Sequence, residues 1–351
     1  MEVNHFPFII WTFRRSGGTN LGQALFENSS YKSVQHEPFN TDRKFKHVIN
    51  DWKKNKDKEE LYTSVEKILK DKILIKHCLE IIPSEINDAI VSVSKKFGYK
   101  HLFLYRENAK SRLLSLNYSL KTDVWGREHL LTRPFDAEGV FASDIQIEKL
   151  LKHEAHCRNE MRRIYDSIES QGSLPLSVSF EQLYKSEHNY ASMLVRQMFC
   201  ELNGSSDYVT DDFLEKTLKG GGQGTNKDYM NFPNSEEFVR EISKLSEYKL
   251  NDVKSDFDIS LDCEHIIVEY YEIWKRLPSV VSTKAILQGV ILSDVDYKLF
   301  NDSKEIKVIR GIRSERISEK FTNNPNAISC RFLSEPLNYD DIPSVISIRP
   351  L

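Results

Sequence analysis

Six consecutive residues near the start of the chain, at positions 14–19, combine chemical groups that bind anions. They read Arg-Arg-Ser-Gly-Gly-Thr, so two guanidinium groups and two hydroxyls accompany two glycines. Glycine adopts positive φ easily and lets backbone N–H groups approach a ligand closely. A helix that begins at the end of the segment adds free N–H groups to the positive field. The segment therefore predicts an anion-binding loop.

The elements on either side of this loop fit that interpretation. Residues 6–13 are apolar apart from Pro7 and Thr12, which is typical of a parallel strand covered on both faces. Thr19 and Asn20 are good N-cap residues, so we expect a helix to begin there. The alternative is an ordinary strand–turn–helix connection without a ligand, because short glycine motifs recur by chance.

The loop lacks the spacing and the lysine of a Walker loop. Its order from Arg15 to Leu21 instead resembles the phosphosulfate loop of the sulfotransferases, commonly written PKSGTTWL. Arg15 takes the position of the lysine, whereas Gly18 and Asn20 depart from the family's threonine and tryptophan. The resemblance implies that Arg15 acts in catalysis by stabilising charge on the leaving phosphate. It also implies that the donor 3′-phosphoadenosine 5′-phosphosulfate is held by Arg14, Arg15, Ser16, Gly17, Gly18, Thr19 and Asn20.

A second basic site is predicted where a later strand ends. Residues 101–105 are expected to form a short strand, and Arg106 follows them directly. Asn108 can cap a helix over 109–120, which places Ser115 about two turns along that helix. An arginine followed by a serine resembles the sulfotransferase pattern RNPKDVAVS, although the spacing here is one residue longer. The resemblance implies that Arg106 and Ser115 hold the 3′-phosphate of the donor; a surface arginine and a helix serine are the alternative.

Two residues are candidates for the catalytic base. Glu37 closes an expected strand, and Pro38 favours extended backbone at Glu37. Ligands bind at the carboxyl ends of strands in open α/β sheets. The Glu-Pro-Phe segment resembles bacterial and carbohydrate sulfotransferases, which implies that Glu37 is the base, with a pKa raised by partial burial. An ion pair between Glu37 and a cationic neighbour is the alternative. His77 is the rival base, because many cytosolic sulfotransferases carry a histidine in an IKTH segment; here no residue separates the lysine from the histidine.

A glycine-rich segment at 216–231 carries three lysines. In cytosolic sulfotransferases an RKG segment in this region touches the 3′-phosphate, and Lys219 with Gly220 is the nearest match. The alternative is a flexible surface loop.

The composition limits the class of protein. Lys and Arg number 49 against 52 Asp and Glu, a net charge of −3, which argues against a general nucleic-acid binder. Five widely spaced cysteines show no spacing typical of a zinc site, and they favour reduced thiols in a cytoplasmic protein. The chain begins without the positive stretch of a signal peptide, and no apolar run approaches the ~20 residues of a membrane span.

These patterns together predict an α/β protein with a three-layer, P-loop-like fold and a central, mostly parallel sheet. We expect a sulfotransferase-like domain over 1–278, ending in a helix at Cys263–Leu277, and a small β-containing appendage over 279–351. The predicted activity transfers a sulfuryl group to a hydroxyl of a carbohydrate, glycolipid or other small molecule, without a metal. A P-loop-type small-molecule kinase and a non-catalytic nucleotide-binding module are the alternatives. The sequence does not specify the acceptor or the oligomeric state.

Overall fold

Two compact units make up the chain in the computed structural model. The first comprises Met1–Tyr184 and Val195–Tyr248, and the second comprises Lys185–Leu194 and Lys249–Leu351. The structure describes residues 6–27, 34–122, 143–173, 175–203, 209–218, 232–250, 252–253, 258–261, 268–276, 284–301, 303–335, 337–338 and 345–350.

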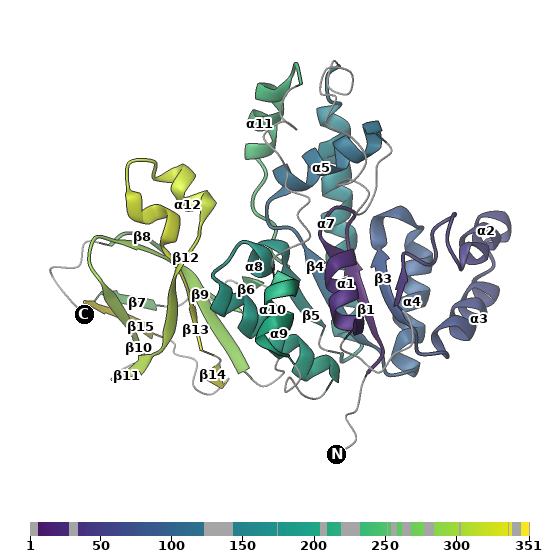
Figure 1. The fold of residues 1–351 in the computed structure, drawn as a ribbon, viewed down its shortest axis with the longest axis horizontal. Coiled ribbons are helices and arrows are strands. Elements are labelled where there is room, and N and C mark those ends of the chain that lie inside the picture. Colours follow the sequence, from purple (N-terminus) through teal and green to yellow (C-terminus); the bar gives the residue numbers. More distant parts are fainter. Residues whose placement is uncertain are drawn as a thin grey trace. The chain divides into compact units, whose positions relative to one another are not determined.

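A five-stranded sheet forms the centre of the first unit, in the order β2-β3-β1-β4-β5 (Figure 1). Each neighbouring pair of these strands is parallel. The central strand β1 is buried along its whole length, as expected for a strand covered on both faces. The bounds are β1 Phe8–Thr12, β2 Val34–His36, β3 Leu74–Cys78, β4 Lys100–Tyr105 and β5 Leu176–Ser179.

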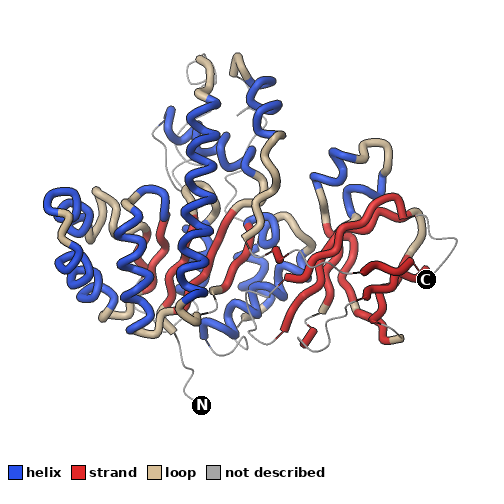
Figure 2. Tube along the Cα trace, turned by 180° about the vertical axis from the view of Figure 1, so that it is seen from behind, coloured by secondary structure: helices blue, strands red, loops and turns tan. Residues whose placement is uncertain are grey.

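Helices cover both faces of this sheet. Figure 1 draws α1 in front of the strands, and Figure 2, seen from behind, has α4 and α7 in front of them. The helices of the first unit are α1 Gly18–Glu27, α2 Lys46–Asn55, α3 Lys58–Leu69, η1 Leu79–Ile81, α4 Ser84–Lys96, α5 Ala109–Thr122, α7 Ile147–Ser170, α8 Phe180–Tyr184, α10 Asp211–Leu218 and α11 Ser235–Ser243. The residues of α9, His188–Asn203, divide between the two units.

The predicted three-layer α/β fold with its P-loop-like connection is confirmed. The buried strand, the polar loop and the helix follow one another as expected, with the helix beginning at Gly18. Because the sheet is parallel, the carboxyl ends of its strands meet at one edge, and the loop between β1 and α1 lies there.

The second unit is built mainly from β-strands, as the sequence predicts for its C-terminal part. One sheet has the order β11-β10-β15-β7 and another the order β12-β13-β9-β8-β6, with β14 beside β9. Their bounds are β6 Asp252–Val253, β7 Asp258–Leu261, β8 Val268–Arg276, β9 Lys284–Ser293, β10 Tyr297–Asn301, β11 Lys304–Ile306, β12 Val308–Ile312, β13 Arg331–Ser334, β14 Leu337–Asn338 and β15 Val345–Pro350. The described residues of 249–351 also form two short helices, α12 Glu315–Lys320 and η4 Pro325–Ser329.

The prediction of a helix over Cys263–Leu277 is wrong for the part of that stretch that the structure describes. Residues Val268–Arg276 form β8, which pairs antiparallel with β9. The segment is rich in aromatic and β-branched residues, and the partner strand supplies the hydrogen bonds that decide its conformation. The two compact units divide before Lys249, whereas the sequence predicts a boundary after residue 278.

Candidate functional site

The connections that follow the parallel strands supply the polar groups of the candidate site. The loop 14–17 follows β1, Glu37 follows β2 and Arg106 follows β4. The carboxyl ends of strands in open α/β sheets are the usual place for ligands. The edge therefore collects residues from separate parts of the sequence.

Two positions of the loop lie in the left-handed backbone region. Arg15 has a φ of 68° and Gly17 a φ of 83°. A non-glycine residue there costs on the order of 1–3 kcal/mol, and such strain concentrates at functional sites. Between them, Ser16 is fully buried, and its Oγ has no hydrogen-bond partner within the structure. The loop thus holds a desolvated hydroxyl next to a strained arginine.

The two glycines are required by close packing. A Cβ on Gly17 would lie 3.0 Å from Cδ2 of Phe180. A Cβ on Gly18 would lie 2.9 Å from Cγ2 of Thr12 and 3.2 Å from Cε of Lys76. The first turn of a helix leaves N–H groups without intrahelical partners. The absence of side chains at these two positions therefore keeps the loop close to Phe180 and to Lys76.

The loop is joined to helix α5 through one hydrogen bond. The Nε of Arg15 donates to the Oγ of Ser115 over 2.7 Å. The sequence predicts both residues for the donor site, and the structure brings them together. The sequence pairs Ser115 with Arg106, whereas the hydrogen bond observed is the one to Arg15.

Arg106 is a buried cation without an ion pair in the described part of the chain. Its guanidinium lies over the Phe180 ring, 3.6 Å from the centroid, and its Nε has no hydrogen-bond partner. Burial lowers the pKa of Arg106 to about 10, against an opposing effect of Glu181. Because Phe180 also borders Gly17, one ring connects Arg106 with the anion loop.

Glu181 lies near Arg106, but the two side chains form no ion pair in the described part of the chain. Its Oε2 accepts a hydrogen bond from the backbone N–H of Glu107 over 2.9 Å. Burial and the neighbouring Glu107 carboxylate raise the pKa of Glu181 to about 7. The Glu107 side chain in turn accepts a hydrogen bond from Ser179 over 2.8 Å. These contacts fix the chain around Arg106.

Glu37 forms an ion pair with Lys76, whose side chain is 6% exposed. Its backbone N–H donates to the Lys76 carbonyl over 2.6 Å, and its φ of 52° is left-handed. The extended geometry expected before Pro38 is therefore wrong. Burial works to raise the pKa of Glu37, but Lys76 outweighs it and holds that pKa below 4.5. The expected increase in pKa is thus also wrong, and the ion pair weighed as the alternative is present.

His77 lies on the other side of its strand from Lys76, because successive side chains of a strand alternate. It is fully buried, and its Nε2 lies 2.8 Å from Oδ1 of Asn87, a residue of α4. Its ring also packs edge-on against Trp11. Burial lowers the pKa of His77 to about 4. The structure does not bring His77 to the anion loop.

The remaining predicted donor residues have different positions. Arg14 points to η1, where its backbone N–H donates to Oε1 of Glu80 over 2.9 Å and its Nε over 3.3 Å. Thr19 is exposed and Asn20 half-buried in the first turn of α1. Lys219 and Gly220 lie outside the described residues.

The sequence interpretation assigns no role to three residues that shape this edge: Lys76, Glu80 and Phe180. Lys76 lies in β3, a strand whose residues are all buried. A buried lysine needs a partner of opposite charge. That requirement is the signal that could have identified it. Phe180 and Glu80 carry no comparable signal, because their roles depend on contacts across the sheet edge.

No protein-family model matches the chain, and no curated protein matches it. Among solved structures, one chain described with the PezAT chromosomal toxin–antitoxin system of Streptococcus pneumoniae matches at 11% identity with a TM-score of 0.28. The match covers 70% of this chain and 89% of that chain. A match at this TM-score identifies neither a family nor a function. Within the described residues, no helix has both the length and the apolar character to cross a bilayer.

Proposed function

We propose that the protein is a sulfotransferase that moves a sulfuryl group from 3′-phosphoadenosine 5′-phosphosulfate to a hydroxyl. The observation that carries the proposal is the state of Arg106, a buried cation beside the anion loop with an unpartnered Nε. A buried charge without an ion pair is costly, so such a group is suited to a ligand that supplies the opposite charge.

Two arginines from separate segments fit the two anionic ends of the donor. Arg106, beside Phe180, would bind the 3′-phosphate. Arg15 and the buried Ser16 hydroxyl, at the start of α1, would bind the 5′-phosphosulfate. The hydrogen bond from Arg15 to Ser115 supports this arrangement, because it fixes the direction of a long flexible side chain. Preorganised donors of this kind stabilise charge that develops during the reaction.

The proposed reaction is an in-line displacement at sulfur. The acceptor oxygen forms a bond to sulfur while the bond from sulfur to the phosphate oxygen breaks, and the acceptor proton passes to the Glu37 carboxylate. By analogy with phosphoryl transfer, the transition state is loose and needs positioned cations more than a strong base. Glu37 is a weak base, because Lys76 holds its pKa low, but it is ionised and therefore able to accept a proton. Lys76 acts as a positioning residue.

The acceptor we favour is a hydroxyl of a carbohydrate, a glycolipid or another small molecule, and we propose no nucleic-acid partner. This class rests on the Glu-Pro-Phe resemblance around Glu37. A cytoplasmic location fits the buried free thiols of Cys78, Cys157 and Cys330. A small-molecule kinase is less favoured, because the loop 14–19 contains no lysine.

The activity can be tested with donor carrying radioactive sulfur. We expect label to move to at least one member of a panel of mono- and oligosaccharides, glycolipids and phenols, with release of adenosine 3′,5′-bisphosphate. Arg106→Met should remove transfer, while Arg240→Met, at an exposed position of α11, should leave it unchanged. Tight binding of adenosine 3′,5′-bisphosphate without transfer to any acceptor would instead indicate a binding module.

A further inference from the structure

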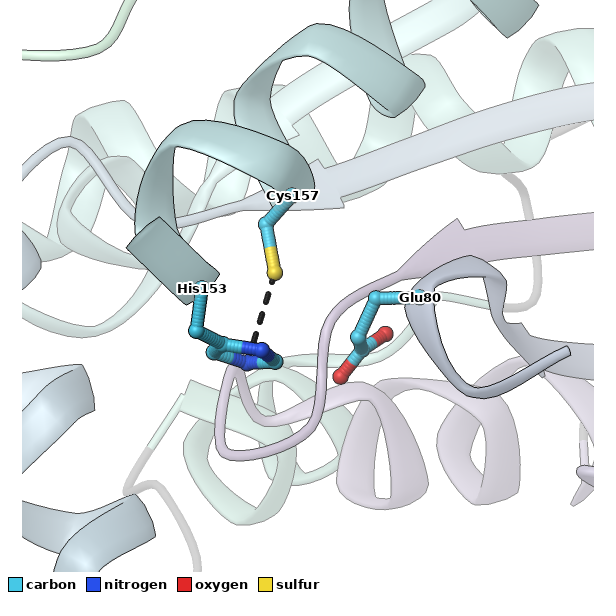
Figure 3. A group of neighbouring side chains, drawn as sticks. All are labelled: Glu80, His153 and Cys157. Carbon is cyan, nitrogen blue, oxygen red and sulfur yellow. Dashed lines mark hydrogen bonds between the residues drawn. The ribbon is translucent and has the colours of Figure 1, made fainter. Parts of the chain in front are cut away.

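Three side chains from η1 and α7, two elements that are distant in sequence, converge beside Arg14 of the anion loop. They are Glu80 on η1 and the pair His153 and Cys157 on α7 (Figure 3). One ligand atom from each lies within 4.8 Å of the others. We propose that these three side chains bind a zinc ion, with a fourth position left for water.

Helix α7 supplies two of the three proposed ligands, at a separation that suits zinc. His153 and Cys157 are four residues apart on α7, so they share one face of the helix. Their Nε2 and Sγ atoms are 3.5 Å apart. Bond lengths of about 2.3 Å to sulfur and about 2.0–2.1 Å to nitrogen, at a tetrahedral angle, separate the two ligand atoms by about 3.5 Å. The pair therefore needs no rearrangement.

Glu80 supplies the third ligand atom from the opposite side. Its Oε1 accepts hydrogen bonds from the backbone N–H and the Nε of Arg14. Its Oε2 is buried and has no hydrogen-bond partner within the structure. The side chain has no exposed surface, so water does not satisfy that oxygen from outside. One oxygen is thus oriented by neighbouring donors while the other is unsatisfied, which is the arrangement expected of a metal-binding carboxylate.

The charges around the three residues are compatible with a divalent cation. A cysteine thiolate and the Glu80 carboxylate neutralise its two positive charges. Arg112 lies beside Cys157, but Glu154 forms a buried ion pair with it. Arg14 is partly exposed, so solvent screens its charge. Three ligands of the types Cys, His and Glu with an open fourth position match zinc better than magnesium or calcium, which prefer oxygen ligands.

A metal at the Glu80–His153–Cys157 cluster would also affect the anion loop. Glu80 contacts the anion loop through Arg14, so a metal bound to Glu80 would fix the connection between η1 and the loop. The proposal does not depend on the sulfotransferase assignment, because it concerns binding of the metal alone to side chains that take no part in the proposed donor site.

The test uses the full chain, freed of metal by a chelator, and titration with cobalt(II) as a spectroscopic substitute for zinc. We expect one cobalt per chain, a thiolate-to-cobalt charge-transfer band, and displacement of cobalt by one equivalent of zinc. Cys157→Ser should abolish the band. His153→Gln should weaken binding by more than the roughly 10–100-fold that follows loss of an outer-shell partner.

Two matched variants control for folding and for other thiols. His156→Ala changes an exposed histidine on the same helix, and Cys330→Ser changes a buried free thiol in the second unit. Both should keep the wild-type titration. Absence of a thiolate band in the wild-type protein would overturn the proposal. So would folded Cys157→Ser and His153→Gln variants that bind cobalt as tightly as the wild type. Far-ultraviolet circular dichroism establishes that each variant is folded.

Discussion

The Nε of Arg15 donates a hydrogen bond of 2.7 Å to the Oγ of Ser115, a residue one hundred positions later in the chain. The contact joins the loop after the first strand of the sheet to the helix after the fourth. Arg15 holds a strained left-handed backbone conformation while it makes this contact. The two segments that the sequence associates with the donor are therefore in direct contact.

The first prediction concerns this contact. Ser115→Ala should weaken binding of adenosine 3′,5′-bisphosphate by about 10–100-fold, because a hydrogen bond from a charged guanidinium contributes about 1.5–3 kcal/mol. Combined with Arg15→Ala it should show a coupling energy of at least about 0.5 kcal/mol, as expected for residues in contact. Isothermal titration calorimetry measures both. Ser111→Ala, one turn earlier on the same helix, is the control; additive effects of Arg15→Ala and Ser115→Ala would contradict the shared site.

The second prediction separates a ligand-binding role of Arg106 from a structural one. Arg106→Met removes a buried cation that lacks an ion pair in the described structure, so the unliganded protein should be as stable as the wild type or more stable. Binding of adenosine 3′,5′-bisphosphate should weaken about 10–100-fold, since hydrogen bonds to charged groups contribute about 1.5–3 kcal/mol. Urea denaturation and calorimetry give the two numbers. A large loss of stability together with unchanged binding would assign Arg106 to the fold alone.

The third prediction concerns the ion pair of Glu37 and Lys76. Glu37→Gln leaves the buried ammonium of Lys76 without its partner and should lower the free energy of unfolding by about 2–3 kcal/mol. This is less than the roughly 3–5 kcal/mol of fully buried pairs, because the Glu37 side chain is 20% exposed. The double variant Glu37→Gln/Lys76→Met should lose less than the sum of the single variants. Simple additivity in urea denaturation would contradict the pairing.

The same ion pair predicts how the stability of the protein changes with pH. The folded pKa of Glu37 lies below its ordinary value of 4.5, so its stabilising contribution is complete above pH 4.5 and disappears as the pH falls through the folded pKa. The stability difference between the wild type and Glu37→Gln should therefore be constant at neutral pH and shrink under acid conditions. A stability difference that grows on acidification would contradict the lowered pKa of Glu37 in the folded protein.

The fourth prediction concerns the base. Glu37→Gln should lower turnover by ~10²–10⁴-fold, the range for a positioned base, with donor affinity nearly unchanged. His77→Asn should affect stability more than turnover, because His77 is buried against Asn87 and away from the loop. Steady-state kinetics with stability measurements on both variants decide between them. Loss of turnover in a stable His77→Asn protein, with activity retained in Glu37→Gln, would make His77 the base.

Local patterns in the sequence predict the first half of the fold well. The apolar run of β1 and the two glycines at 17 and 18 are local patterns, and the structure confirms the strand, the loop and the helix that follows them. The stretch Val268–Arg276 is different, because its conformation depends on pairing with β9. A short amphipathic segment fits a helix or a strand until its partner is known.

Contacts between distant segments explain why the site was only partly predictable. The sequence predicts Arg15, Ser115 and Arg106 for the donor, but the bond from Arg15 to Ser115 depends on how distant segments pack. The low pKa of Glu37 depends on Lys76, which burial pattern alone does not pair with it. Glu80 meets His153 and Cys157 only through the packing of η1 on α7, so widely spaced cysteines gave no sign of the cluster.

The most direct test of the proposed donor site compares two nucleotides that differ by one phosphate. Calorimetric titration of the wild-type protein should show adenosine 3′,5′-bisphosphate binding at least about 10-fold more tightly than AMP, because only the former supplies a 3′-phosphate to Arg106. Arg106→Met should remove that preference, whereas Arg240→Met should keep it. Equal affinities of the wild-type protein for the two nucleotides would contradict the 3′-phosphate site and with it the sulfotransferase proposal.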